Sequence, residues 1–138
     1  MAKSILIDSG VIIAALSRRE QHHNWAKSNL DVLTTVCVTC EAVLTECFFS
    51  LEEEPRGQEM LYSLLEQGAL KVEFSLVENL SEILALMRRY RDVPMSFADA
   101  CLVRMSELRK DSVIFTTDSD FNVYRRNGRQ TIPVMAPW

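Results

Sequence analysis

Short runs of apolar residues alternate along the chain with longer segments in which apolar residues recur every three or four positions. The short runs show little polar alternation, which is typical of strands covered on both faces. They predict strands at residues 4–8, 34–39, 70–74, 112–116 and 131–134. The longer segments have the periodicity of amphipathic helices. They predict helices at residues 11–16, 21–33, 41–53, 58–66, 76–90 and 97–108.

Strands that alternate with helices of this length predict parallel βαβ units, and right-handed crossovers place the helices on both faces of the sheet. We therefore expect the α/β class, as a three-layer α/β/α sandwich with a central, mostly parallel sheet of four to five strands. The chain has 138 residues, 48% of them hydrophobic, which is enough to bury one core. Because no repeat or linker interrupts it, we expect one domain over residues 1–138.

The first apolar run, Ile5-Leu6-Ile7, ends at the carboxylate of Asp8. It therefore predicts a strand that enters the fold and not a signal peptide. No apolar run approaches the roughly 20 residues of a membrane-spanning helix. These features favour a soluble, cytoplasmic protein that does not interact with membranes.

The chain has four cysteines, and two of them, Cys37 and Cys40, have C-x-x-C spacing. A structural zinc site needs a second pair of ligands, and none follows at metal-binding spacing. A redox pair is the alternative explanation. We interpret all four cysteines as buried free thiols, since free cysteine behaves as a small hydrophobic residue.

Three acidic residues lie where strands end or helices begin. Asp8 closes the first predicted strand, Asp118 follows the fourth, and Asp99 lies at the start of the last helix. In open parallel sheets, ligands bind at the carboxyl ends of the strands, near the point where the strand order reverses. An unpaired buried carboxylate is costly, and hard divalent cations prefer carboxylate oxygens. The positions of these acids favour a divalent cation site.

Each acid can also be explained as a helix cap. Asp99 and the serine three residues before it have the spacing of a capping box, and Asp8 and Asp118 both precede segments that can begin a helix or turn. Glu41 and Glu46 are both candidates for a fourth acid. Glu41 lies nearer the apolar stripe of its helix and Glu46 lies opposite it, so periodicity does not choose between them.

Four stretches share their order and spacing with a known family. They are Ile5-Leu6-Ile7-Asp8-Ser9-Gly10, Thr39-Cys40-Glu41-Ala42-Val43-Leu44-Thr45-Glu46, Ser96-Phe97-Ala98-Asp99-Ala100 and Phe115-Thr116-Thr117-Asp118-Ser119-Asp120-Phe121. With them the sequence resembles the PIN-domain ribonucleases, of the kind found as the toxin of bacterial VapBC toxin–antitoxin pairs. The resemblance implies a PIN-like fold and an Mg²⁺-dependent endoribonuclease that hydrolyses RNA phosphodiester bonds, with Mn²⁺ as an alternative ion. It also implies an RNA substrate, a small antitoxin partner and a homodimer.

Carried over position by position, the resemblance implies a set of site residues. The metal-binding and catalytic acids are Asp8, Glu46, Asp99 and Asp118, with Asp120 as an accessory acid. Ser9 and Thr116 match the positions of hydroxyl groups beside the acids. The resemblance thus favours Glu46 over Glu41. One departure is that the small residues common after the third acid are replaced here by the bulkier Val103-Arg104-Met105.

The net charge of −4 argues against a strongly basic nucleic-acid-binding protein, but the charge is unevenly distributed. Residues 1–69 contain five basic and ten acidic residues, whereas residues 70–138 contain ten and nine. Arg125, Arg126 and Arg129 follow the last acids closely, so we predict that they bind RNA phosphates, with little base specificity. The alternative is that they form a solvated loop.

Other sites have weaker support. Gly10 stands where a haloacid-dehalogenase phosphatase has a second acid, and a receiver domain has paired acids and a lysine that this chain lacks. The scattered glycines do not form a dinucleotide-binding loop, and the adjacent His22 and His23 cannot point together. Within the PIN family, the alternatives to a toxin are a housekeeping RNA-processing nuclease and a catalytically idle binding module. The complete set of acids favours an enzyme.

Overall fold

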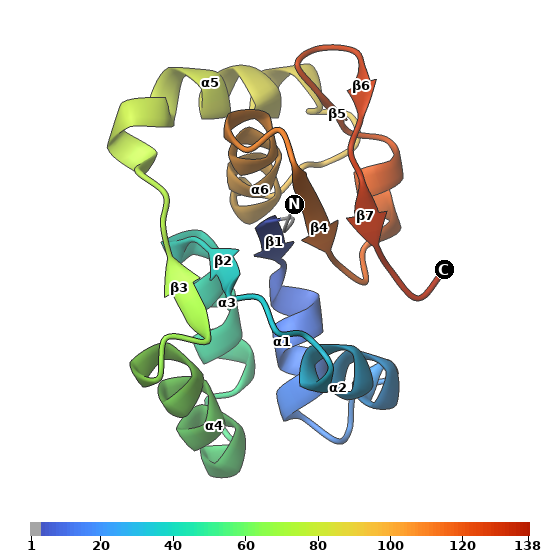
Figure 1. The fold of residues 1–138 in the computed structure, drawn as a ribbon. Coiled ribbons are helices and arrows are strands. Elements are labelled where there is room, and N and C mark those ends of the chain that lie inside the picture. Colours follow the sequence, from blue (N-terminus) through green and yellow to red (C-terminus); the bar gives the residue numbers. More distant parts are fainter. Residues whose placement is uncertain (1–3) are drawn as a thin grey trace.

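Five short strands form a sheet in which every neighbouring pair is parallel (Figure 1). The computed structural model describes residues 4–138. The strand order is β3-β2-β1-β4-β7. The strands are β1 (Ser4–Ile7), β2 (Cys37–Thr39), β3 (Leu70–Val72), β4 (Ser112–Phe115) and β7 (Val134–Met135). The predicted α/β class and parallel sheet are confirmed.

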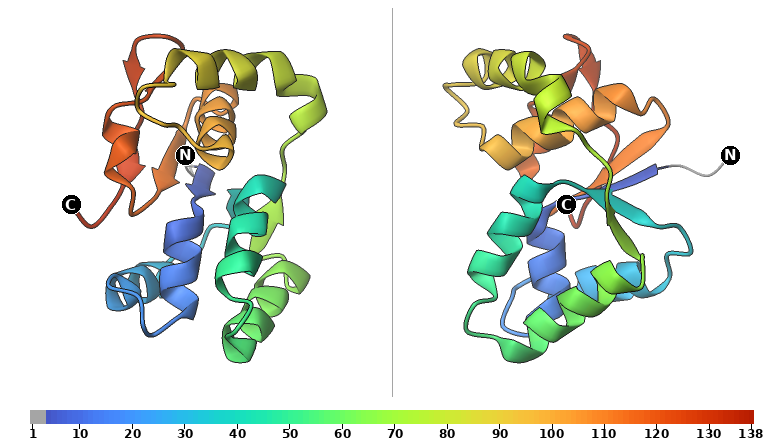
Figure 2. Two further views of the ribbon diagram at one scale, coloured as in Figure 1. Left: turned by 180° about the vertical axis from the view of Figure 1, so that it is seen from behind. Right: turned by 90° about the vertical axis from the view of Figure 1, so that its left-hand side faces the viewer.

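Six α-helices lie within the described part of the chain, one at each predicted position. They are α1 (Ser9–Leu16), α2 (His23–Asp31), α3 (Glu41–Ser50), α4 (Pro55–Glu66), α5 (Leu76–Arg89) and α6 (Phe97–Leu108). In Figure 1, α5 and α6 lie at the top and α1, α2 and α4 at the bottom, with the strands of the five-stranded sheet between them. The views in Figure 2 show the same separation. The helices therefore cover the sheet as a PIN-like fold requires.

Helix α6 is the most buried helix, with eight of its twelve residues in the core. The bulky Val103 and Met105 are among them. Arg104, between them, donates from Nε to Asn79 Oδ1 of α5 at 2.8 Å. The fold thus accommodates the larger residues after Asp99 by packing two into the core and using the third to link α6 to α5.

The prediction of one strand over residues 131–134 is wrong. The segment is divided between β6 (Gln130–Thr131), which pairs antiparallel with β5 (Arg125–Arg126), and β7 in the main sheet. Two features explain the division. A three-residue turn, residues 127–129, joins β5 to β6, and Asn127 and Gly128 in it both have positive φ, as such tight hairpin turns need. Pro133 has no N–H to donate, although its carbonyl accepts from Ile114 N at 2.9 Å.

The sequence also predicts that the chain has no membrane-spanning helix and no signal peptide. None of the helices between residues 4 and 138 is long and apolar enough to cross a membrane. Residues 1–3, which belong to the segment for which we predicted no signal peptide, lie outside the described residues.

Candidate active site

The loops that follow β1 and β4 lie side by side at the carboxyl edge of the sheet. Strands β1 and β4 are parallel neighbours, with Ile7 paired to Phe115. From β1 the chain runs outward through β2 and β3, whereas β4 lies on the other side of β1. The strand order therefore reverses between β1 and β4, which is where ligands bind in open parallel sheets.

Asp8 is buried immediately after β1 and is held through both of its carboxylate oxygens. Its Oδ1 accepts from Ser9 N at 2.7 Å, which makes Asp8 the N-cap of α1. Its Oδ2 accepts from the Thr116 hydroxyl at 2.8 Å. Asp8 is therefore a helix cap and also part of a polar cluster that spans β1 and β4.

Asp118 is tied to the same cluster through Thr116. The Thr116 hydroxyl, which donates to Asp8, accepts from Asp118 N at 2.9 Å. Asp118 Oδ1 in turn accepts from Asp120 N at 2.9 Å, so Asp118 caps the short 3₁₀ helix η1 (Ser119–Asn122). One threonine hydroxyl thus links the acid after β1 to the acid after β4.

Glu46 reaches this cluster from α3. Its Oε1 accepts from the Ser9 hydroxyl at 2.6 Å, and the side chain is half-buried. Glu41, on the first turn of the same helix, is exposed. The structure therefore brings Glu46, and not Glu41, next to Asp8.

Asp99 lies on the first turn of α6 and takes part in the predicted capping box with Ser96. Asp99 N donates to Ser96 Oγ at 3.0 Å, and Ser96 N makes a longer contact of 3.4 Å with Asp99 Oδ2. A shorter hydrogen bond, 2.9 Å, comes to the same Oδ2 from the hydroxyl of Tyr124. The cap explanation is correct for Asp99, and an additional partner holds its side chain.

Burial and mutual repulsion perturb these carboxyls. Burial raises the pKa of Asp8 to about 7, and the charges of Asp99 and Asp118 add to the shift, against the hydrogen bonds from Thr116 and Ser9. Burial also raises the pKa of Asp99, again with a contribution from Asp118. The three aspartates therefore lie close enough to oppose each other's ionisation, which a bound cation would relieve.

The arrangement of free oxygens fits a hydrated cation. Among the residues described, Asp99 Oδ1, Asp118 Oδ2 and Glu46 Oε2 accept no hydrogen bond, whereas the other oxygen of each group is held. No three acidic, histidine or cysteine side chains between residues 4 and 138 converge tightly enough to hold an ion by themselves. Mg²⁺ binds through one or two carboxylates and keeps several waters, so this donor set fits Mg²⁺ with water completing its shell.

Gly10 allows the first turn of α1 to approach the loop after β4. A Cβ atom at this position would lie 2.5 Å from Thr117 Oγ1. A larger residue would force the Thr117 side chain to shift, and the glycine avoids this contact.

The remaining predicted site residues are Asp120 and the three arginines near the β5–β6 hairpin. Asp120 is half-buried in η1. Burial raises the pKa of Tyr124, and the charges of Asp99 and Asp120 add to the shift. Arg125 Nη1 donates to the carbonyl of Asn122 at 2.6 Å. Arg126 donates from Nη1 and Nη2 to the carbonyls of Ser106 and Lys110, each at 3.2 Å. Only Arg129 among the three predicted RNA-binding arginines is exposed and makes no hydrogen bond to the described residues.

Tyr124 is a site residue that sequence reasoning missed. The general signal for it is that a buried tyrosine hydroxyl needs a partner, but nothing in the pattern indicates that the partner is an acid 25 residues earlier. The four cysteines are free and buried, as predicted.

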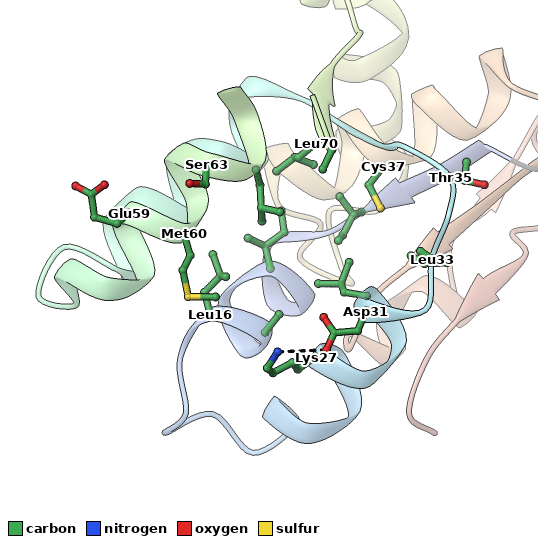
Figure 3. Close-up of a pocket in the computed structure, with 16 residues that line it drawn as sticks. Leu16, Lys27, Asp31, Leu33, Thr35, Cys37, Glu59, Met60, Ser63 and Leu70 are labelled. Carbon is green, nitrogen blue, oxygen red and sulfur yellow. Dashed lines mark hydrogen bonds and ion pairs between the residues drawn. The ribbon is translucent and has the colours of Figure 1, made fainter. Parts of the chain in front are cut away.

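An apolar pocket of about 460 Å³ lies in another part of the molecule, between α1, α2, α4 and the start of β3 (Figure 3). Ile12 and Leu16 of α1, Leu30 of α2 and Leu70 line it. Its polar groups include an exposed ion pair between Lys27 and Asp31 at 3.2 Å. No predicted site residue lines this pocket.

The parallel sheet and the acidic residues at its switch point define the class of protein. The sequence matches the PIN domain family over residues 5–127, and the chain belongs to that family. Among solved structures, it is similar to the crystal structure of VapC20 from Mycobacterium tuberculosis, a sarcin–ricin loop cleaving toxin. The TM-score is 0.77 at 20% sequence identity, and the match covers 87% of this chain and 94% of that one. At this identity the match shows a shared fold. No curated protein matches the sequence.

Proposed function

We propose that this PIN domain is a metal-dependent endoribonuclease that hydrolyses RNA phosphodiester bonds and serves as the toxin of a toxin–antitoxin pair. The observation that carries the proposal is the meeting of Asp8, Glu46, Asp99 and Asp118 at one edge of the sheet, each oriented by a hydrogen bond. Membership of the PIN family and the fold shared with VapC20 support it.

The donor set suits Mg²⁺, with Mn²⁺ as the alternative, because all the candidate ligands are hard carboxylate oxygens. Asp8, Asp99 and Asp118 would hold the ion directly or through water, with Asp120 as an accessory acid. A bound divalent ion lowers the pKa of a water molecule and stabilises negative charge on the phosphate.

The side chains around the ion have separate roles in this proposal. Glu46 is a further ligand or the group that accepts a proton from the attacking water, at the Oε2 that accepts no hydrogen bond from the described residues. Ser9 and Thr116 orient Glu46 and Asp8 through the hydrogen bonds that they donate. Arg129 is the best placed of the predicted arginines to meet RNA phosphates, because it is exposed.

As a toxin, the protein would act in the cytoplasm, form a homodimer and be held inactive by a small antitoxin. A short reading frame upstream that encodes a DNA-binding protein would support this role. Its absence would favour the housekeeping RNA-processing nuclease.

The experiment is incubation of the purified protein with total RNA and with tRNA in Mg²⁺, Mn²⁺ or EDTA, beside the Asp8→Asn variant. We expect cleavage only with a divalent ion, and a loss of at least about a hundredfold in the variant, because losing a ligand should cost at least as much as losing a group that orients one.

The matched control is Asp31→Asn, which removes an exposed acid at the apolar pocket, away from the cluster. This variant should cleave RNA at the wild-type rate. Unchanged cleavage by Asp8→Asn at equal purity would contradict the site assignment. Binding of RNA by the wild type without cleavage in any ion would favour the idle binding module.

A further inference from the structure

Tyr124 is completely buried next to the acidic cluster. Its side chain is 0% exposed, and its hydroxyl donates to Asp99 Oδ2 at 2.9 Å. The other donor to the same oxygen, Ser96 N, is farther away at 3.4 Å. The tyrosine hydroxyl is therefore the main group that determines which oxygen of Asp99 faces the protein.

The position of this hydroxyl is fixed by the packing of the ring. Tyr124 meets Tyr90 and Phe121 edge to face, with both pairs of ring centroids 5.2 Å apart. Its backbone N–H donates to the carbonyl of Asp120 at 3.1 Å, so the ring is also tied to the segment that Asp118 caps. Edge-to-face pairs of this kind restrain the ring of a buried aromatic residue.

We infer that Tyr124 is a positioning residue for the metal site: by holding Asp99 Oδ2, it presents Asp99 Oδ1 to the cation. This inference rests on the metal site of the proposed function and names the group that orients one of its ligands. Partners of this kind, which hydrogen-bond the distant oxygen of a ligating carboxylate, fix its orientation and strengthen binding. A purely structural role, in which Asp99 only satisfies a buried hydroxyl, predicts no effect on metal binding.

The test is titration of the metal-free protein with Mn²⁺ by calorimetry, without RNA, for the wild type and for Tyr124→Phe. The variant keeps the ring and removes only the hydroxyl. We expect Mn²⁺ to bind about 10–100-fold more weakly.

Tyr90→Phe is the matched control. It removes a second buried tyrosine hydroxyl from the same aromatic group, but that hydroxyl accepts from Arg125 N at 2.9 Å and makes no hydrogen bond to an acid within residues 4–138. Its Mn²⁺ affinity should equal that of the wild type. Equal affinity in the wild type and Tyr124→Phe would overturn the inference, and so would an equal loss in both variants, which would indicate general loosening.

A second measurement tests whether Tyr124 acts through Asp99. When Asp99→Asn is combined with Tyr124→Phe, the second change should weaken Mn²⁺ binding no further, because both act through one carboxylate. Additive losses would overturn the inference. The same titrations distinguish this inference from the proposed function. A wild-type protein that binds Mn²⁺ but cleaves no RNA would contradict the ribonuclease activity, and the effect of Tyr124→Phe on Mn²⁺ affinity would still test the inference. A wild type that binds neither Mn²⁺ nor Mg²⁺ overturns both.

Discussion

The acidic cluster and the apolar pocket both include residues of helix α1 or its N-cap, yet they affect the stability of the fold in opposite directions. At its first turn, α1 is capped by Asp8, whose buried carboxylate accepts from the Thr116 hydroxyl and is repelled by the charges of Asp99 and Asp118. Further along, Ile12 and Leu16 of the same helix line a pocket made mostly of aliphatic side chains (Figure 3).

The difference between these two regions shows where folding energy is gained and where it is lost. Apolar side chains around the pocket stabilise the fold by leaving water. Buried carboxylates that repel one another destabilise it unless they are protonated or bind a cation. The volume of the apolar pocket therefore does not mark it as the reactive site. The free-energy cost of burying several carboxylates together is what identifies the candidate site.

In the metal-free protein, the buried Asp8 carboxylate should destabilise the folded state when it is ionised. Its pKa is raised from 3.8 to about 7, so between these pH values the folded protein keeps a proton that the unfolded chain has released. The contribution of Asp8 to stability therefore falls as pH rises through this window and levels off above it. A shift of this size corresponds to about 4 kcal/mol.

The Asp8→Asn variant has no carboxyl group to ionise at this position, so it lacks this destabilisation. Its free energy of unfolding relative to the wild type should rise by about 4 kcal/mol between pH 4 and pH 8. Urea denaturation of both proteins in the presence of a chelator measures the difference. A difference that stays constant with pH would show that Asp8 ionises normally.

A substitution at the apolar pocket should lower the free energy of unfolding, whereas Asp8→Asn removes a destabilising charge. Leu70 is buried at the start of β3 and lines the pocket. Leu70→Ala should lower the free energy of unfolding by about 3 kcal/mol, because it deletes buried methyl groups and enlarges a cavity. Mn²⁺ affinity should not change, since the acids are untouched. Weaker Mn²⁺ binding in this variant would show that the two regions are coupled through the sheet.

Arg126 and Arg129 of the β5–β6 hairpin differ in the same way, since Arg126 is hydrogen-bonded to the protein and Arg129 is exposed. Arg126 has two carbonyl partners near the end of α6, and its Nε is buried. Arg126→Ala should cost about 1 kcal/mol of stability, because it removes a part-buried and an exposed hydrogen bond, while it also removes an Nε that has no partner among the described residues. Thermal denaturation measures this effect.

Arg129→Ala should leave stability unchanged and reduce the salt dependence of RNA binding. In a plot of log affinity against log salt concentration, the slope should change by about 1 unit, as for one lost phosphate contact. The same slope before and after the change would remove Arg129 from the RNA interface.

Local signals predicted much of the fold. The helix over residues 97–108 has the predicted bounds, because a capping box defines where it begins. The first turn of α4 was missed: the helix begins at Pro55, a residue well suited to the first helical position. The division of residues 131–134 between two sheets depends on a tight turn and a proline whose effect is clear only when the partner strands are known.

The candidate site was predicted less completely, because its contacts join distant parts of the chain. Glu46 was preferred over Glu41 from a family resemblance, and the physical reason for its position is a hydroxyl at Ser9, 37 residues earlier. The acid that Tyr124 contacts lies 25 residues earlier, and the Ser106 carbonyl that holds Arg126 lies 20 residues earlier. Periodicity describes which face of a helix is buried, but it carries no information about which side chain from another element meets that face.

The pairing of β1 with β4 has a consequence for biosynthesis. Asp8 and the Thr116 hydroxyl that holds it are 108 residues apart, and β1 lies between two strands that are both made later. A nascent chain therefore carries Asp8 long before the segment that completes its surroundings has been translated. The long loop that must close also predicts slow folding. The acidic cluster assembles only after the segment that carries Thr116 and Asp118 has left the ribosome, so a shorter nascent chain does not yet hold the complete site.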